Sequence, residues 1–250
     1  MLRKAICFVF LFPLLCSLSV SAQSLDEIIN KNIQARGGLD KLKAVKSMKF
    51  TGKIRFQGLE APLTLQFKRP NNARLEIVVQ GKTIVQAYDG DTGWAIVPFT
   101  GSSDPEKMSE DDLKEIQEQA DFDGPLIDYK AKGHTVELVG KEDLEGTSVY
   151  KLKVTLKTGD VRYLFIDAEN YLELKTTSKQ KRQGTEFEVD SYLGDYKEVN
   201  GILIPHAIEN KTQGRVISQF TLEKIETNVA IEDTIFKMPA KSAQKEPAKP

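Results

Sequence analysis

The stretch from Asn32 to Ile54 decides the fold and reads NIQARGGLDKLKAVKSMKFTGKI. Gly37 and Gly38 interrupt a first helical pattern, because glycine adopts the left-handed backbone of a helix end at little steric cost. After a short second helical pattern, apolar and polar residues alternate from Met48 to Phe56, which is the period of a strand with one buried face. We therefore predict that two helices fold back across a sheet.

Most of the remaining sequence has the pattern of strands, which are separated by short turns rich in Gly, Asn and Asp. One more helix is expected near Ser109 to Ala120, where Leu113, Ile116 and Ala120 recur at helical spacing. About a dozen strands in this arrangement indicate one long antiparallel meander. A flat sheet of that size would expose unpaired edge strands, which favour aggregation. Such a sheet either closes or curls into a half-open barrel, so we expect a mainly β (α+β) fold with a large curved antiparallel sheet covered by short helices.

The sequence at the N-terminus predicts that the protein is exported. Two positive charges precede an apolar run from Ala5 to Val20, and the next residues fit the small-residue cleavage rule, so residues 1–22 read as a cleaved signal peptide. A transmembrane anchor is the alternative, but the run of about 16 residues is shorter than the ~20 that a bilayer needs. We expect residues 23–240 to form a single domain in the periplasm, followed by a disordered tail over residues 241–250, which has no large apolar side chain.

Charge and motifs exclude several function classes. The chain has 35 Lys and Arg residues against 36 Asp and Glu, so it lacks the basic surplus typical of nucleic-acid binding. Both cysteines, Cys7 and Cys16, lie in the predicted signal peptide, which leaves no thiol for a metal site or a disulfide. His134 and His206 are far apart in the sequence, and no nucleophile elbow or phosphate-binding loop is present. We predict no metal, no cofactor and no enzymatic activity.

Several short motifs follow one another in a consistent order and spacing. They are Gly37-Gly-x-x-x-Leu42 before the first strand, Tyr88-Asp-Gly90 with Gly93-Trp94, Tyr150-Lys-Leu-Lys-Val154, Asp195-Tyr-Lys-Glu-Val-Asn-Gly-Ile202 and Phe236-Lys-Met-Pro239. Together they resemble the LolA/LolB-like family of outer membrane lipoprotein-sorting proteins over nearly all of residues 23–239.

The resemblance implies an unclosed barrel with helices filling its open side and an apolar cavity between them. In carriers of that family the cavity shelters lipoprotein acyl chains, each CH₂ of which gains roughly 0.8 kcal/mol on leaving water. The expected function is therefore a periplasmic carrier or binder of lipoprotein acyl chains or lipids. Its expected partners are the acylated ligand and an inner-membrane transporter or outer-membrane receptor, and the protein is expected to be a monomer. A protein-binding or sensing module on the same fold is the alternative.

The inward positions of the early strands give the candidate ligand-binding residues. They are Phe50, Ile54, Phe56, Leu65, Phe67, Leu75, Ile77 and Trp94. Two alternatives without a ligand stay open. Trp94 could pack beside its turn against Tyr88. The other side chains could form a packed core that leaves no chamber. A packed core leaves few voids larger than a water molecule, whereas an acyl chain needs a few hundred cubic ångströms.

Overall fold

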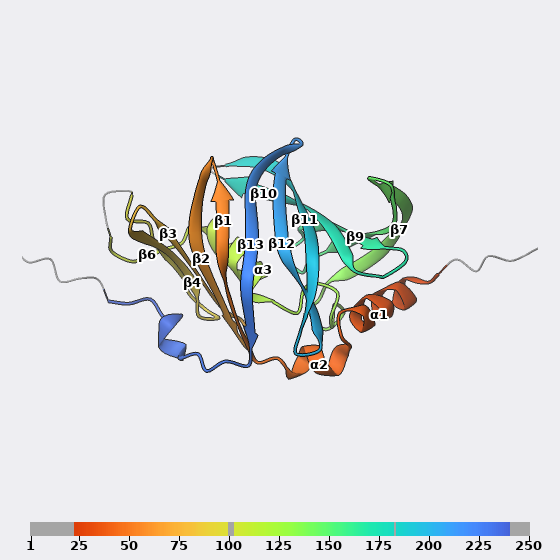
Figure 1. Cartoon of the computed structure of the whole chain (residues 1–250), viewed down its shortest axis with the longest axis horizontal. Helices are drawn as coiled ribbons and strands as arrows, with labels where there is room; N and C mark the ends of the chain where they lie inside the picture. The colour runs from red at the N-terminus through yellow and green to blue at the C-terminus, as the bar shows by residue number, and fades with distance from the viewer. Residues whose placement is uncertain (1–22, 100–102, 183, 241–250) are drawn as a thin grey trace, which may run out of the picture.

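A computed structural model describes residues 23–99, 103–182 and 184–240 (Figure 1). The predicted signal peptide and the predicted disordered tail lie outside the described residues. The helices are α1 (Leu25–Ala35), α2 (Leu39–Ala44), α3 (Glu110–Ala120) and the 3-10 helix η1 (Asp233–Ile235). The strands are β1 (Ser47–Phe56), β2 (Leu59–Lys68), β3 (Asn72–Val79), β4 (Lys82–Tyr88), β5 (Gly93–Ile96), β6 (Glu106–Lys107), β7 (Thr135–Leu144), β8 (Thr147–Thr155), β9 (Val161–Asp167), β10 (Glu173–Arg182), β11 (Thr185–Val199), β12 (Ile202–Thr212) and β13 (Arg215–Thr227).

The strands form one antiparallel sheet of 13 strands, in the order β6-β5-β4-β3-β2-β1-β13-β12-β11-β10-β9-β8-β7. Two meanders, β1–β6 and β7–β13, are joined by the pairing of β1 with β13, where Phe50 lies opposite Ile225. The edge strands β6 and β7 do not pair with each other, so the barrel remains open. This confirms the predicted fold. The strand that the sequence did not predict is β6, whose two residues are too few to give a periodic pattern.

Helix α3 lies across the inner side of the sheet and connects its two edge strands, β6 and β7. One side of α3 packs Ile116 against β3 and β4. The other side reaches the β8–β9 hairpin, where Lys114 pairs with Asp160 at 2.6 Å. Glu118 of the same helix also pairs with Arg162 in β9. The helix is thereby held to both halves of the sheet.

The turn between α1 and α2 explains why the first helix is interrupted. Gly37 has φ +120°, and a Cβ there would lie 2.3 Å from the carbonyl oxygen of Gly201 in the β11–β12 turn. Beside this contact, the backbone N–H of Leu203 donates to the carbonyl of Arg36 at 3.0 Å. Two turns distant in sequence can pack this closely because glycine has no side chain. The predicted cover is confirmed, since Leu42 of α2 is buried in the core cluster of the inner face.

Residues 228–239 run along the other, outer face of the sheet after β13. Side chains of this face donate to their backbone: Lys68 Nζ to Ile231 at 2.7 Å and Arg74 to Ile235 at 2.7 Å. The indole Nε1–H of Trp94 donates to the carbonyl of Phe236 at 2.6 Å. The C-terminal segment therefore covers β2, β3 and β5 from outside.

Candidate functional site

Strand register gathers seven of the eight predicted ligand-binding residues on the inner face. Phe50 in β1 pairs with Leu65 in β2, and Leu65 pairs with Leu75 in β3. Alternation along the same strands places the others on this face as well: Ile54, Phe56, Phe67 and Ile77. The structure thus brings these side chains together into a continuous apolar floor.

The apolar floor is closed at one end and open along much of its length. Phe50 and Ile54 are buried in the same core cluster as Leu42 of α2, and the ring of Phe67 packs edge-on against Phe50 with centroids 5.8 Å apart. Phe56, Leu65, Phe67, Leu75 and Ile77 are half-buried. At the far end, Leu59 in β2 is exposed to 46%. A fully packed core would bury all of these side chains, so the floor retains apolar surface that a ligand can cover.

The structure places Trp94 apart from the other seven residues. It pairs with Ala87 on the outer face of the sheet, whereas its neighbour Gly93 pairs with Tyr88 on the inner face. The indole is 2% exposed and packs with Val85, Ala87 and Met238. A one-residue step along a strand reverses the face, which explains why a residue next to the inner row points outward. Trp94 therefore anchors the C-terminal segment and does not face the floor.

A pocket of about 230 Å³ lies at the closed end of the floor, between the helices and the sheet. Its apolar wall continues from the floor through Phe50, which belongs to both. Its lining residues are Asn32, Arg36, Leu42, Val45, Met48, Phe50, Phe122, Asp123, Gly124, Pro125, Leu126, Glu173, Leu193, Tyr196, Ile202, Leu203, Ile204 and Pro205. The volume far exceeds a water molecule but is below the roughly 300 Å³ at which whole-ligand pockets begin. The pocket can hold one end of a ligand whose remainder lies on the floor.

The polar side of this pocket comes from α1, β10 and β11. Arg36, the C-cap of α1, donates through Nη1 to the carbonyl of Asp123 at 3.2 Å. Glu173 opens β10, and its carboxylate accepts a hydrogen bond from the hydroxyl of Thr176. The phenol of Tyr196 in β11 donates to the backbone carbonyl of Glu173 at 2.7 Å. Sequence reasoning missed these residues, since a strand pattern does not show that a single polar side chain points inward.

Burial shifts the pKa values of two of these groups. Burial raises the pKa of Glu173, against the opposing hydrogen bond from Thr176 and the charges of Arg36 and Arg162. Burial also raises the pKa of Tyr196, and the nearby charge of Glu173 adds to the effect. The pocket is therefore an environment of low polarity, in which charge interacts strongly.

An ion-pair cluster, formed by Lys43, Arg69 and Asp123, fastens the wall of the pocket to the sheet. Arg69 binds both carboxylate oxygens of Asp123, at 2.6 and 2.8 Å, and also donates to the carbonyl of Val45 at 2.7 Å. Lys43 of α2 donates to the same carboxylate at 3.0 Å. Burial alone would raise the pKa of Asp123, but the bonds from Arg69 and Lys43 outweigh it and lower the pKa to about 2. The cluster thus ties α2 and the loop after α3 to the end of β2.

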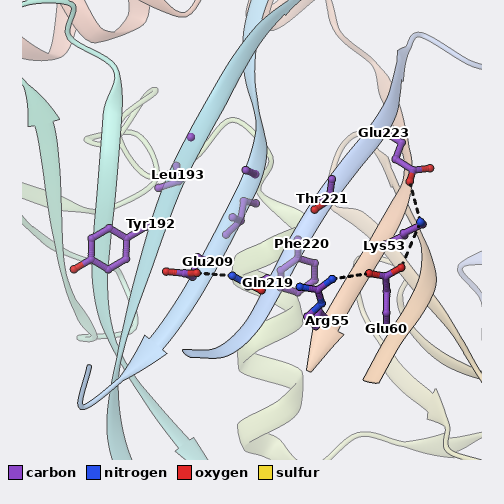
Figure 2. A pocket seen from close by; sticks show the side chains of 13 residues that line it. Lys53, Arg55, Glu60, Tyr192, Leu193, Glu209, Gln219, Phe220, Thr221 and Glu223 are labelled. Carbon is purple, nitrogen blue, oxygen red and sulfur yellow. Dashed lines mark hydrogen bonds and ion pairs between the residues drawn. The ribbon is translucent and has the colours of Figure 1, made fainter. Parts of the chain in front are cut away.

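A larger hollow of about 610 Å³ lies on the outer face (Figure 2). Its floor is a row of small residues, in which Gly194 pairs with Ala207 and Ala207 pairs with Thr221. The polar side chains around it bind one another: Lys53 pairs with Glu60 and Glu223, Arg55 pairs with Glu60, and Gln219 donates a hydrogen bond to Glu209. Because these polar groups already have partners, the hollow offers less to a ligand than the inner pocket.

The described residues contain no cluster of side chains that could hold a metal ion. No group of three His, Cys, Asp or Glu side chains converges there as metal ligands would. His206 is buried in β12, whereas His134 precedes β7, and four strands separate β12 from β7 in the sheet. In the part of the chain that the structure describes, the helices are all too short or too polar to cross a membrane.

Comparison with known proteins supports the fold. No family model matches the sequence, and no curated protein is significantly similar to it. A LolA superfamily protein from Nitrosomonas europaea superposes with a TM-score of 0.57 and 15% identity, covering 86% of this chain and 98% of that one. A DUF1329 family protein from Desulfovibrio piger gives a TM-score of 0.59 and 13% identity, with coverage of 86% and 98%. A Vibrio parahaemolyticus domain named as an outer membrane lipoprotein-sorting protein gives 0.56 and 12%, with coverage of 84% and 94%. The resemblance to LolA/LolB-like proteins is thereby confirmed at the level of the fold.

Proposed function

We propose that this protein binds an acyl chain of a lipid or lipoprotein on its inner face. The observation that carries the proposal is the pocket of about 230 Å³, which continues through Phe50 into an apolar floor of half-buried side chains. Covering that floor with an acyl chain removes apolar surface of both partners from water, which gives roughly 25 cal/mol for each Å². The fold that the chain shares with a LolA superfamily protein supports the same reading.

A binding measurement with a matched pair of variants tests the proposal. Delipidated protein is titrated with a dansyl-labelled fatty acid and with a dansyl-labelled lipopeptide. Wild type should bind saturably, and Phe67→Glu should weaken binding at least tenfold, because it places a charge on the floor. Val78→Glu is the control, since Val78 lies on the outer face of the neighbouring strand and is 41% exposed.

Both variants must keep the circular dichroism spectrum of the wild type. If wild type binds no acylated probe, the carrier function is refuted. A protein-binding or sensing module then becomes the better account. If Val78→Glu loses binding as much as Phe67→Glu, the inner face is not the site.

The export, cellular location and oligomeric state of the protein are also proposals. We propose that residues 1–22 are removed on export, that residues 23–240 act as one monomeric domain in the periplasm, and that the protein has no catalytic role. A carrier in this compartment would receive its acylated ligand from an inner-membrane transporter or deliver it to an outer-membrane receptor. N-terminal sequencing of protein isolated from the periplasm checks the first step: a chain that begins at Gln23 supports it, and a chain that keeps Met1 refutes it.

A further inference from the structure

Two oppositely charged groups, Arg36 and Glu173, line the pocket at the closed end of the floor. Among the described residues, neither the guanidinium of Arg36 nor the carboxylate of Glu173 lies within 4.0 Å of an oppositely charged group. Other charged groups near the inner face are paired, such as Arg69 with Asp123 and Arg162 with Glu118. The contrast singles out Arg36 and Glu173 on the pocket wall.

Such an arrangement costs stability unless something else satisfies the charges. Ionised groups lose hydration when they line an apolar cavity, and a more distant charge, such as Arg36 for Glu173, offsets that loss less than a partner at hydrogen-bond distance would. Arg36 uses one N–H for the carbonyl of Asp123, and Glu173 accepts from one hydroxyl. Both groups keep free hydrogen-bonding capacity, since a guanidinium has five N–H donors and a carboxylate has about four lone-pair sites.

The chemistry of Arg36 and Glu173 defines which kind of ligand could bind both side chains at once. A guanidinium matches the oxygens of a phosphate, and a carboxylate matches an ammonium group. A ligand that offers both is zwitterionic, with the two charges only a few bonds apart. The volume of about 230 Å³ suits a head group rather than a whole lipid, and Phe50, Leu193 and Ile204 give the attached chain an apolar exit to the floor.

We propose that this pocket binds the zwitterionic head group of a phosphoethanolamine lipid, with the phosphate at Arg36 and the ammonium at Glu173. The inference rests on the proposed acyl-chain binding and adds which end of the lipid enters first. The head lies inside at the closed end, and the chain runs outward along the apolar floor. Burial raises the pKa of Glu173, and an ammonium group bound beside the carboxyl would lower that pKa again by favouring the ionised form.

Competition among lysolipids of one chain length tests the inference. Lauroyl lysophosphatidylethanolamine, lauroyl lysophosphatidylglycerol and monolaurin each displace the dansyl fatty acid from delipidated protein. Wild type should bind the ethanolamine lipid about tenfold more tightly than the other two. Glu173→Gln should lose about tenfold for the ethanolamine lipid and little for the glycerol lipid. Arg36→Gln should weaken both phospholipids about tenfold and leave monolaurin unchanged.

Glu60→Gln and Arg55→Gln are the controls, because they remove the same charges from the outer face and should leave every affinity unchanged. Free phosphoethanolamine should compete at least a hundredfold more weakly than the lysolipid, and equal competition would overturn the proposal. If Arg36→Gln fails to fold, the wild-type preference and Glu173→Gln still decide. Equal binding of all three lysolipids by wild type overturns the head-group inference and leaves acyl binding standing. If no lysolipid binds, the proposed function itself fails.

Discussion

Replacing Asp123 by Asn should loosen the wall of the pocket and lower the stability of the whole domain. The side chain of Asp123 is 6% exposed and accepts two hydrogen bonds from Arg69 and one from Lys43. Asn keeps the shape of the side chain but removes its charge, so both cations lose the ion pair that orients them. Removing one partner of a buried pair is costly, because the other charge stays behind without compensation.

The lowered pKa of Asp123 gives the size of the expected loss in the free energy of unfolding. A fall from 3.8 to about 2 corresponds, at 1.36 kcal/mol for each pH unit, to about 2 kcal/mol of stability at neutral pH. For a domain of this size that is a fall in Tm of about 4–8 °C. Because the pKa of the folded state lies below that of the unfolded state, this contribution is present above about pH 4 and is lost as the pH falls toward 2.

Urea unfolding of wild type and Asp123→Asn at pH 7 and at pH 3 measures the effect. The difference in free energy of unfolding should be about 2 kcal/mol at pH 7 and about half of that at pH 3, because wild type then loses part of the contribution. Asp195→Asn is the control: its exposed pair with Lys197, at 2.7 Å, should contribute less than about 0.5 kcal/mol. A difference that is near zero at pH 7, or equal at both pH values, would refute the reasoning.

Three further substitutions test separate parts of the structure. Gly52→Ala would place a Cβ 2.0 Å from a backbone oxygen of β13 and should cost about 3 kcal/mol in urea unfolding, whereas Gly194→Ala, with no atom within 4 Å of its Cβ, should cost less than about 0.5 kcal/mol. Glu173→Gln should raise Tm at pH 7, because burial raises the pKa of the carboxyl and disfavours its ionised form; the gain should disappear in acid, where the carboxyl is protonated in both folded and unfolded states. Phe236→Ala should cost about 3–5 kcal/mol in urea unfolding, because it removes a side chain that is fully buried; a cost below about 1 kcal/mol would contradict this.

Local periodicity was enough to predict a large antiparallel sheet with a few short helices. Strands of seven or more residues, such as β1 and β4, repeat their pattern several times, and the helix break at Gly37 is visible as a glycine pair. The partner of Gly37 could not be predicted, because its contact with Gly201 joins two turns that are distant in sequence. The pairing of β1 with β13 is likewise a contact between the two ends of the domain, and only the family resemblance anticipated an unclosed barrel.

The apolar half of the candidate site was predictable and the polar half was not. Phe50, Leu65 and Phe67 share a face because a strand alternates with period two, which the sequence shows directly. Trp94 was assigned to the floor with them, but only the pairing of Gly93 with Tyr88 reveals that its side chain points outward. Glu173 gave no signal, since its neighbours in the sequence read as an ordinary strand and its burial depends on α1 and β11.

The pocket combines features that each lower stability. Arg36 and Glu173 remain without ion-pair partners among the described residues, and the adjoining floor keeps half-buried apolar side chains. A stable fold would favour collapse of α2 and the following loop onto this volume, because close packing restores the lost contacts. The cluster of Asp123, Arg69 and Lys43 acts against collapse: it fixes α2 and the loop to the end of β2 with hydrogen bonds of defined length and direction. The ion pairs of Asp123 therefore stabilise an open pocket that core side chains would otherwise fill. A preformed binding site requires such a pocket.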